Sequence, residues 1–162
     1  PLAMQVCGYG FNQIAWVIEW HVLAMFAPGF VTGKLNDRFG VQRVMFAGIV
    51  LCITAAVVNL LGNSVWHFWL ALLVLGLGWN WLFTGATTLL TSTYTAPHKA
   101  RVQGINDAVV FGTLVCSSLS SGVLVASYGY ALMNAVAIPL LLWAMWVLWR
   151  HSRLPHAAPP FA

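Results

Sequence analysis

The sequence predicts an all-α, polytopic membrane protein with about five transmembrane helices, and three observations support this fold class. Hydrophobic residues make up 60% of the chain and charged residues only 6%, whereas a soluble domain usually carries about 25% charged residues. The apolar residues gather in five stretches, each near the ~20 residues that a helix needs to cross a bilayer. These stretches do not alternate in polarity as barrel strands do, so each is expected to be a helix that satisfies its own backbone.

The five predicted spans form one transmembrane bundle over residues 1–149, followed by a tail over residues 150–162. The spans cover residues 13–33, 42–62, 66–91, 104–126 and 130–149. Turn-forming residues separate them, as at Gly62-Asn63-Ser64. Because the chain opens at Pro1 without an initiator Met or a basic segment, we expect a piece of a longer protein and not a signal peptide.

The distribution of Lys and Arg predicts the orientation of the bundle. All seven lie in alternate connections, over residues 34–43, 99–101 and 150–153, and the connections at 62–66 and 127–130 contain none. Since Lys- and Arg-rich loops stay in the cytoplasm, the N-terminus is expected outside and the tail in the cytoplasm, in a cell membrane such as the bacterial inner membrane. The net charge of +4 is therefore attributed to topology, and no nucleic-acid partner is expected.

The connection over residues 33–43 carries the most specific motif of the chain. It reads Gly-Lys-Leu-Asn-Asp-Arg-Phe-Gly-Val-Gln-Arg and resembles the signature loop of the major facilitator superfamily, G-x-x-x-D-R-x-G-[R/K]-[R/K]. The matching positions are Gly33, Asp37, Arg38, Gly40 and Arg43. Val41 and Gln42 stand where that family often has basic residues, which suggests the second-half copy of the loop.

The resemblance extends along the chain, which looks like the eighth to twelfth helices of that family, most of its C-terminal six-helix bundle. It implies secondary active transport of a small molecule by alternating access through a cavity between two bundles. It also implies proton coupling, no cofactor, and an N-terminal half as the missing partner. In the family the signature loop acts as a charged latch that holds one access state; a solvated loop without a switching role is the alternative.

Local physics suggests a role for each signature residue. Glycine allows positive φ and close helix approach. Asp37 and Asp107 are both expected near helix starts, where the helix dipole favours a carboxylate. Arg38 and Arg43 can bind carboxylates or the carbonyls at a helix C-terminus. Asp107 is expected to act at the gate, where it binds one of these arginines or a basic residue of the missing half.

Glu19 and His21 are ionisable residues within the first predicted span, and such residues are functional candidates because a charge is costly in lipid. Glu19 is a candidate for proton coupling, with a hydrogen bond to a neighbouring helix as the alternative. His21 can relay protons near physiological pH or bridge two helices in its neutral form. Positions two apart point to different faces of a helix, so the two side chains are not expected to pair.

The third predicted span carries a polar stripe on one helical face. It consists of Asn80, Thr84, Thr87, Thr88 and Thr91. The stripe either borders the substrate path or supplies hydrogen bonds between helices, which is a normal use of Asn and Thr in membranes. The sequence leaves these two interpretations open.

Other function classes find little support. The three cysteines, Cys7, Cys52 and Cys116, are far apart, without the spacing of a metal site or a disulfide framework. The few Asp and Glu residues are scattered, so an enzyme is not expected. A haem protein would depend on His21 and His67 near the outer side. An inactive truncated carrier or a non-transporting membrane partner remains an alternative, and the substrate, coupling ion, transport direction and oligomeric state cannot be derived from the sequence.

Overall fold

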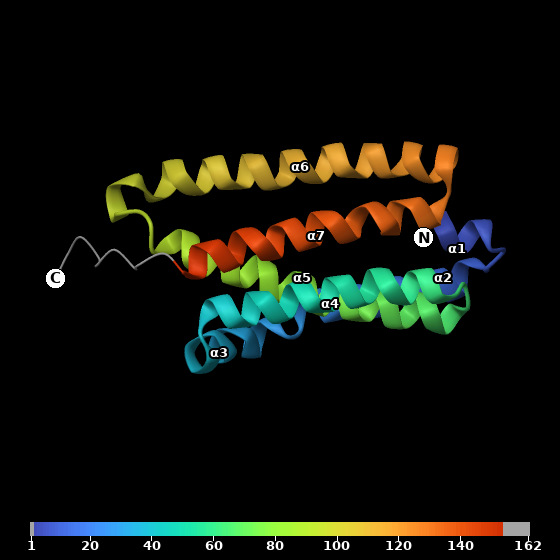
Figure 1. Cartoon of the computed structure of the whole chain (residues 1–162), viewed down its shortest axis with the longest axis horizontal. Coiled ribbons are helices and arrows are strands. Elements are labelled where there is room, and N and C mark those ends of the chain that lie inside the picture. The colour runs from blue at the N-terminus through green and yellow to red at the C-terminus, as the bar shows by residue number, and fades with distance from the viewer. Residues whose placement is uncertain (1, 154–162) are drawn as a thin grey trace.

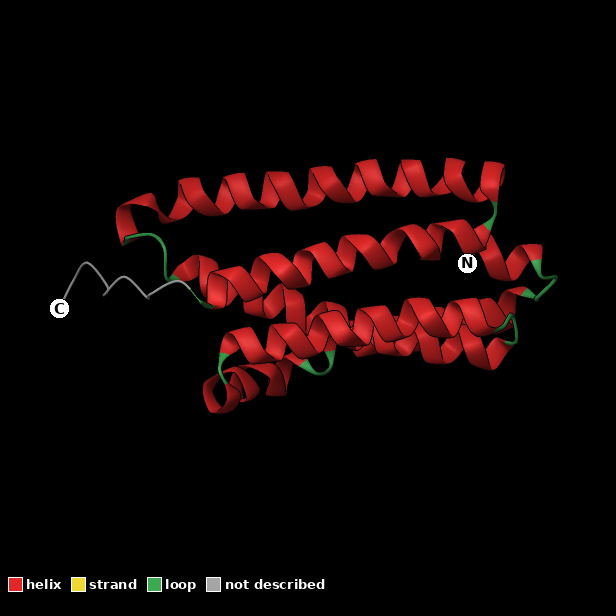
Figure 2. Ribbon diagram, viewed as in Figure 1, coloured by secondary structure: helices red, strands yellow, loops and turns green. Residues whose placement is uncertain are grey.

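The structure, a computed structural model of the chain, describes residues 2–153. The elements in chain order are α1 (Leu2–Val6), α2 (Phe11–Phe26), α3 (Gly29–Phe39), α4 (Val41–Leu61), α5 (Val65–Thr91), the 3₁₀ turn η1 (Ala96–His98), α6 (Lys99–Tyr128) and α7 (Tyr130–Ser152). Within this part of the chain every element is a helix (Figure 2). The predicted all-α polytopic bundle is therefore confirmed.

Four helical segments are long and apolar enough to cross a membrane: α4, α5, η1 with α6, and α7. The helices α2 and α3 pass the same test only as a pair, which makes up to five spans. The long helices run side by side along the length of the molecule (Figure 1). Residues 150–152 extend α7, and the remainder of the predicted tail from residue 154 lies outside the described residues.

The predicted first span, residues 13–33, is broken instead of continuous. The helix α2 ends at Phe26, α3 begins at Gly29, and the two axes differ by 43°. The cause is Pro28, because proline has no backbone N–H and its ring clashes with the carbonyl one turn earlier. Hydropathy does not register this break, because proline and its neighbours do not interrupt the apolar run.

The most extensive helix contact joins α4 and α5, and two facing glycines allow it. A Cβ atom on Gly78 would lie 2.8 Å from both the carbonyl oxygen of Gly48 and the Sγ atom of Cys52. A Cβ on Gly48 would lie 3.0 Å from the carbonyl oxygen of Gly78. Small residues at such interfaces let two backbones approach closely, which is how helices gain packing energy in lipid.

The remaining helices are arranged around this pair. The helix α2 packs on α5, α7 packs on α4, and α6 makes its contacts mainly with α7 and η1. No residue of α6 is buried, and α6 runs along one edge of the molecule, set apart from α4 and α5 (Figure 1). The described residues therefore form an open bundle, with α6 attached through one neighbour.

The end of the bundle that carries α1 contains a small buried core with a cluster of tryptophans beside it. The core there contains Met4, Val17 and Phe68, each no more than 2% exposed. On the neighbouring surface four tryptophans from α2 and α5 contact one another with ring centroids 5.8–6.0 Å apart. They are Trp16, Trp20, Trp66 and Trp69. Such rings are typical of the membrane–water interface.

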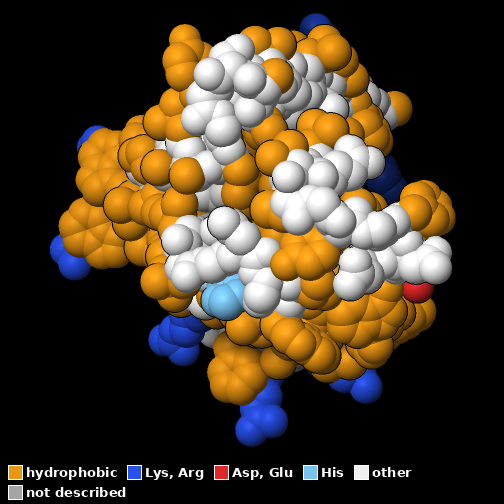
Figure 3. All heavy atoms as spheres, turned by 90° about the vertical axis from the view of Figure 1, so that its right-hand side faces the viewer, with side chains coloured by type: hydrophobic (Ala, Val, Ile, Leu, Met, Phe, Trp, Pro, Cys, Tyr) orange, Lys and Arg blue, Asp and Glu red, His pale blue; other side chains and the backbone are white. Residues whose placement is uncertain are grey.

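The charged connections gather at the opposite end of the molecule from this aromatic end. The α3–α4 turn, the α5–α6 connection and the end of α7 lie at one end, and the turns at Asn63 and Gly129 lie at the other with α1 (Figure 1). Seen from the α1 end, the surface facing the viewer is hydrophobic or uncharged, and Lys and Arg atoms occur only at its outline (Figure 3). This separation is the geometry that a positive-inside topology requires.

We expect Gly78→Ala to lower stability by about 1–3 kcal/mol, because the added methyl group meets backbone and a buried sulfur atom. Thermal unfolding of the purified protein in detergent measures this loss. Gly104→Ala in α6 is the matched control, because a Cβ there meets no atom within 4 Å. Equal melting temperatures for the two variants would contradict the proposed close contact of α4 with α5.

Candidate functional site

The signature segment over residues 33–43 is mostly helical, which corrects its interpretation as a loop. The helix α3 continues to Phe39, and Gly40 alone forms the turn before α4 begins at Val41. Gly40 has φ +87°, a conformation that favours glycine. The sharp turn expected from the sequence therefore rests on one residue.

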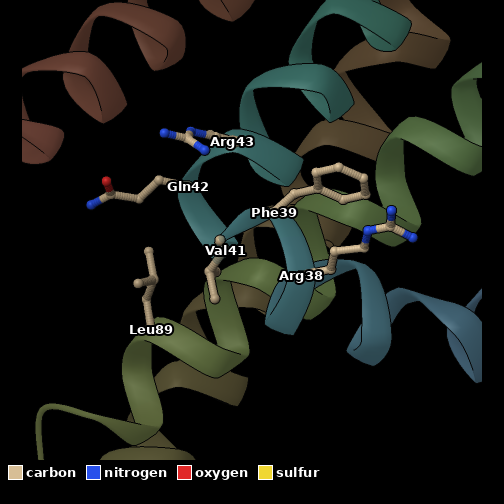
Figure 4. A pocket seen from close by; sticks show the side chains of 7 residues that line it. Arg38, Phe39, Val41, Gln42, Arg43 and Leu89 are labelled. Atoms are coloured by element: carbon tan, nitrogen blue, oxygen red, sulfur yellow. The ribbon is translucent and has the colours of Figure 1, made fainter.

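The two matched arginines flank this turn on opposite sides. Arg38 and Arg43 point away from each other around a hollow of about 500 Å³ that also contacts Leu89 of α5 (Figure 4). The guanidinium of Arg38 lies 5.3 Å from the ring centroid of Phe39, a cation–π distance. Both arginines are exposed, so each is accessible to a partner outside the described residues.

Two expectations about the gate residues are corrected by the structure. A Cβ at Gly33 would meet no atom within 4 Å, so no close approach requires glycine there. Asp107 lies two turns inside α6, which begins at Lys99, and the helix dipole acts mainly within the terminal turn, so this carboxylate does not gain the expected N-terminal stabilisation. Asp37 lies in the last turn of α3, three residues before Gly40, the N-cap of α4.

Glu19 and His21 lie on different sides of α2. Glu19 is exposed beside a shallow hollow whose other lining residues, Ile18, Val22, Leu23 and Phe26, are apolar. A charged group is costly in apolar surroundings at membrane depth. The position of Glu19 therefore suits contact with a partner outside the described residues.

His21 joins α2 to α5 through its imidazole ring. Its Nδ1 atom lies 2.6 Å from the carbonyl oxygen of Leu72. A carbonyl only accepts hydrogen bonds, so Nδ1 carries a proton and donates it to this bond. Gly76 permits this contact, because a Cβ there would lie 2.6 Å from the carbonyl oxygen of His21.

The polar stripe on α5 divides into two kinds of side chain. Asn80 is buried and bonds to residues of α2 and α3. The hydroxyl of Thr87 donates to the carbonyl oxygen of Phe83 at 2.9 Å, and that of Thr88 donates to Thr84 at 2.8 Å. The hydroxyl groups of Thr87 and Thr88 therefore donate within their own helix. Of the two interpretations that the sequence left open for the stripe, hydrogen bonding between helices applies to Asn80.

Several buried amides were missed by the sequence reasoning. Asn36 lies within the signature segment, is 6% exposed, and has no hydrogen-bond partner on either amide atom. Asn59 of α4 donates to Asn134 of α7 at 3.3 Å. The signal that could have found them is the presence of asparagine in otherwise apolar helices, where an unpaired amide is costly.

A cavity of about 380 Å³ lies between the helices near α1. It is mostly apolar and is lined by residues of α1, α2, α4, α5, α6 and α7. Its polar lining consists of His21, Asn59, Ser121, Tyr130 and Asn134. These groups offer hydrogen bonds to an occupant; among residues 2–153 no group of three or more His, Cys, Asp or Glu is arranged to hold a metal ion.

The bond from His21 to Leu72 predicts different outcomes for two substitutions at this position. His21→Leu removes the donor and should lower stability by about 0.5–1.5 kcal/mol, the net value of one hydrogen bond. His21→Asn retains an N–H near the position of Nδ1 and should keep most of that stability. Thermal unfolding distinguishes the two variants, and equal losses would argue against the bond.

Comparison with known proteins gives the chain its relatives. It is 43% identical to the riboflavin transporter RfnT of Brucella anthropi over 141 residues, and the aligned segment covers 87% of this chain and 35% of that protein. It is 30% identical to the uncharacterized MFS-type transporter YddS of Bacillus subtilis over 153 residues, and the aligned segment covers 88% of this chain and 35% of that protein. The chain thus spans about a third of the length of these curated relatives.

More distant relatives include the drug efflux pump JefA of Mycobacterium tuberculosis, which is 24% identical over 149 residues, or 90% of this chain and 29% of that protein. No solved protein structure gives a significant match. The family model described as Major Facilitator Superfamily matches residues 1–162, the whole chain. Together with the signature segment and the apolar helices, this match shows that the chain belongs to the major facilitator superfamily of membrane transporters.

Proposed function

We propose that this chain forms part of a secondary carrier that moves riboflavin or a closely related flavin across the cell membrane by alternating access. The observation that carries the proposal is the 43% identity to a riboflavin transporter over 87% of the chain. Identity of this level over five candidate spans supports a shared transport role. The more distant efflux relatives make outward transport of another compound the competing outcome.

The open bundle supports the view that the chain acts together with a second part of a carrier. No residue of α6 is buried, and large apolar side chains of this helix such as Phe111 and Leu119 are 63% and 70% exposed. A transport cavity needs walls on both sides, and one bundle supplies one wall. We therefore infer that the chain on its own does not transport, which is also what an inactive truncated carrier would show.

Glu19 is proposed as the proton-coupling carboxylate, with His21 as a candidate relay. The apolar hollow beside Glu19 supports the proposal, because an ionisable side chain among apolar residues at membrane depth is a functional candidate. The Nε2 atom of His21 is not used in the bond to Leu72, which makes it the candidate relay atom. Thr84 and Thr87, which are half-buried on α5, are proposed to border the substrate path.

The signature segment is proposed to act at the cytoplasmic gate. Arg38 and Arg43 are exposed on either side of the Gly40 turn, and Asp37 and Asp107 are exposed carboxylates. Exposed charges at this end can form ion pairs with the missing N-terminal half. We propose that such pairs hold the carrier in one access state.

Uptake of radiolabelled riboflavin by proteoliposomes tests the transport proposal. Vesicles with the complete carrier should take up riboflavin faster than empty vesicles, and more so with an inward proton gradient. Vesicles holding only this chain should show no uptake. Failure of the complete carrier to move riboflavin, or export of an unrelated drug instead, would reject the flavin assignment.

Glu19→Gln in the complete carrier isolates the proton step. The variant keeps the shape of the side chain but cannot exchange a proton, so uptake should lose its dependence on the proton gradient while exchange of riboflavin across the membrane persists. Glu19→Asp is the control, since it retains a carboxylate at the same position of α2 and should keep the proton dependence. Unchanged proton dependence in the Glu19→Gln variant would remove this residue from the coupling mechanism.

The orientation proposal predicts the results of reporter fusions. Alkaline phosphatase, which is active only outside the cytoplasm, should be active when fused at Asn63 or Gly129 and inactive when fused at Lys99. Green fluorescent protein should give the opposite pattern. A fluorescent fusion at Asn63 or Gly129 would show that the assignment of N-terminus outside and C-terminus in the cytoplasm is wrong.

A further inference from the structure

The break between α2 and α3 leaves a backbone carbonyl that needs a donor. In a continuous helix the carbonyl oxygen of Met25 would accept a hydrogen bond from the N–H of Gly29. The helix α2 ends at Phe26 and the chain bends by 43° before α3, and no such bond joins Gly29 to Met25 among the described residues. An unsatisfied carbonyl within lipid costs several kcal/mol.

Asn80 of α5 supplies the missing donor. Its Nδ2 atom donates to the carbonyl oxygen of Met25 at 2.7 Å. Its Oδ1 atom accepts from the hydroxyl of Thr32 in α3 at 2.6 Å. Since a carbonyl cannot donate, these two partners also determine which amide atom is nitrogen.

Thr32 completes the connection on the α3 side. Its hydroxyl lies 2.9 Å from the carbonyl oxygen of Pro28, at the bend itself. Asn80 and Thr32 are 5% and 0% exposed, so water does not compete for these bonds. One side chain of α5 is thus bonded to the last turn of α2 and the first turn of α3.

We infer that Asn80 is a positioning residue that holds the α2–α3 bend and thereby places the signature segment at the end of α3. The helix α3 is short and carries Gly33, Asp37 and Arg38, so its direction determines where these residues lie at the cytoplasmic end. Among the described residues, the backbone hydrogen bonds at the bend join Ala27 to Leu23 on one side and Val31 and Thr32 to Pro28 on the other, and none links the two sides. Release of Asn80 would let α3 turn relative to α2, as a gate must during alternating access; this last step rests on the proposed transport function.

The test measures the bend directly. Spin labels on cysteines at Val22 of α2 and Lys34 of α3, two exposed positions, report the distance across the break by double electron–electron resonance in nanodiscs. The labels are placed in a background without the native cysteines. With Asn80 present we expect one narrow distance distribution.

Asn80→Leu, which is close in shape but cannot donate, should broaden that distribution and shift it to longer distances as the span straightens. Thr32→Val should give a smaller change in the same direction, because the bond to Met25 remains. Thr54→Val in α4 is the matched control and should give no change, since its hydroxyl bonds to Val50 of its own helix. Size-exclusion chromatography checks that each variant remains folded and monodisperse.

A folded Asn80→Leu variant with the original distance distribution would overturn the inference. So would an equal change in the Thr54→Val control. Riboflavin uptake by the same variants, in the complete carrier, separates the two proposals. Altered distances in Asn80→Leu support the positioning role even if the unaltered carrier fails to move riboflavin, and unaltered distances reject it whatever the uptake.

Discussion

A backbone in lipid has to find every hydrogen-bond partner within the protein, and this constraint governs both the regular and the irregular parts of the bundle. The long helices meet it along their own ladders. At Pro28 the series of backbone hydrogen bonds is interrupted. The side-chain amide of Asn80, on a different helix, donates to the carbonyl oxygen of Met25 instead. The one broken span is therefore tied to α5 by a polar contact, whereas the other helices depend mainly on packing.

Packing in turn is set by where the chain places its small residues. Gly48 and Gly78 bring α4 and α5 together, and Gly76 brings α5 to α2 closely enough for His21 to reach Leu72. The helix α5 consequently contacts α2, α3 and α4 and acts as the centre of the described bundle. Asn80, which bonds to Met25 before the bend and to Thr32 after it, lies on this same helix.

In this member of the major facilitator superfamily, one helix of the bundle, α6, has no buried residue. The helix α6 makes its contacts mainly with α7 and η1. The cavity beside it is lined by residues of six helices. Apolar surfaces of this kind are stable only against lipid or another helix. The chain spans about a third of the length of the riboflavin transporter that it matches.

The sequence by itself determined the fold class, the family and the separation of charged from uncharged connections. These follow from composition, apolar length, the positions of Lys and Arg, and the match of Gly40 and its neighbours to the signature motif, all of which are local properties. Only the tertiary structure decided where the helices begin and end. In the structure Asp37 lies in the last turn of α3 and Asp107 lies in the body of α6, because helices extend beyond the apolar residues that hydropathy detects. The tertiary structure also decided which polar side chains meet: the partner of Asn80 lies 55 residues away in the chain, and no periodicity within one helix can specify a contact between two.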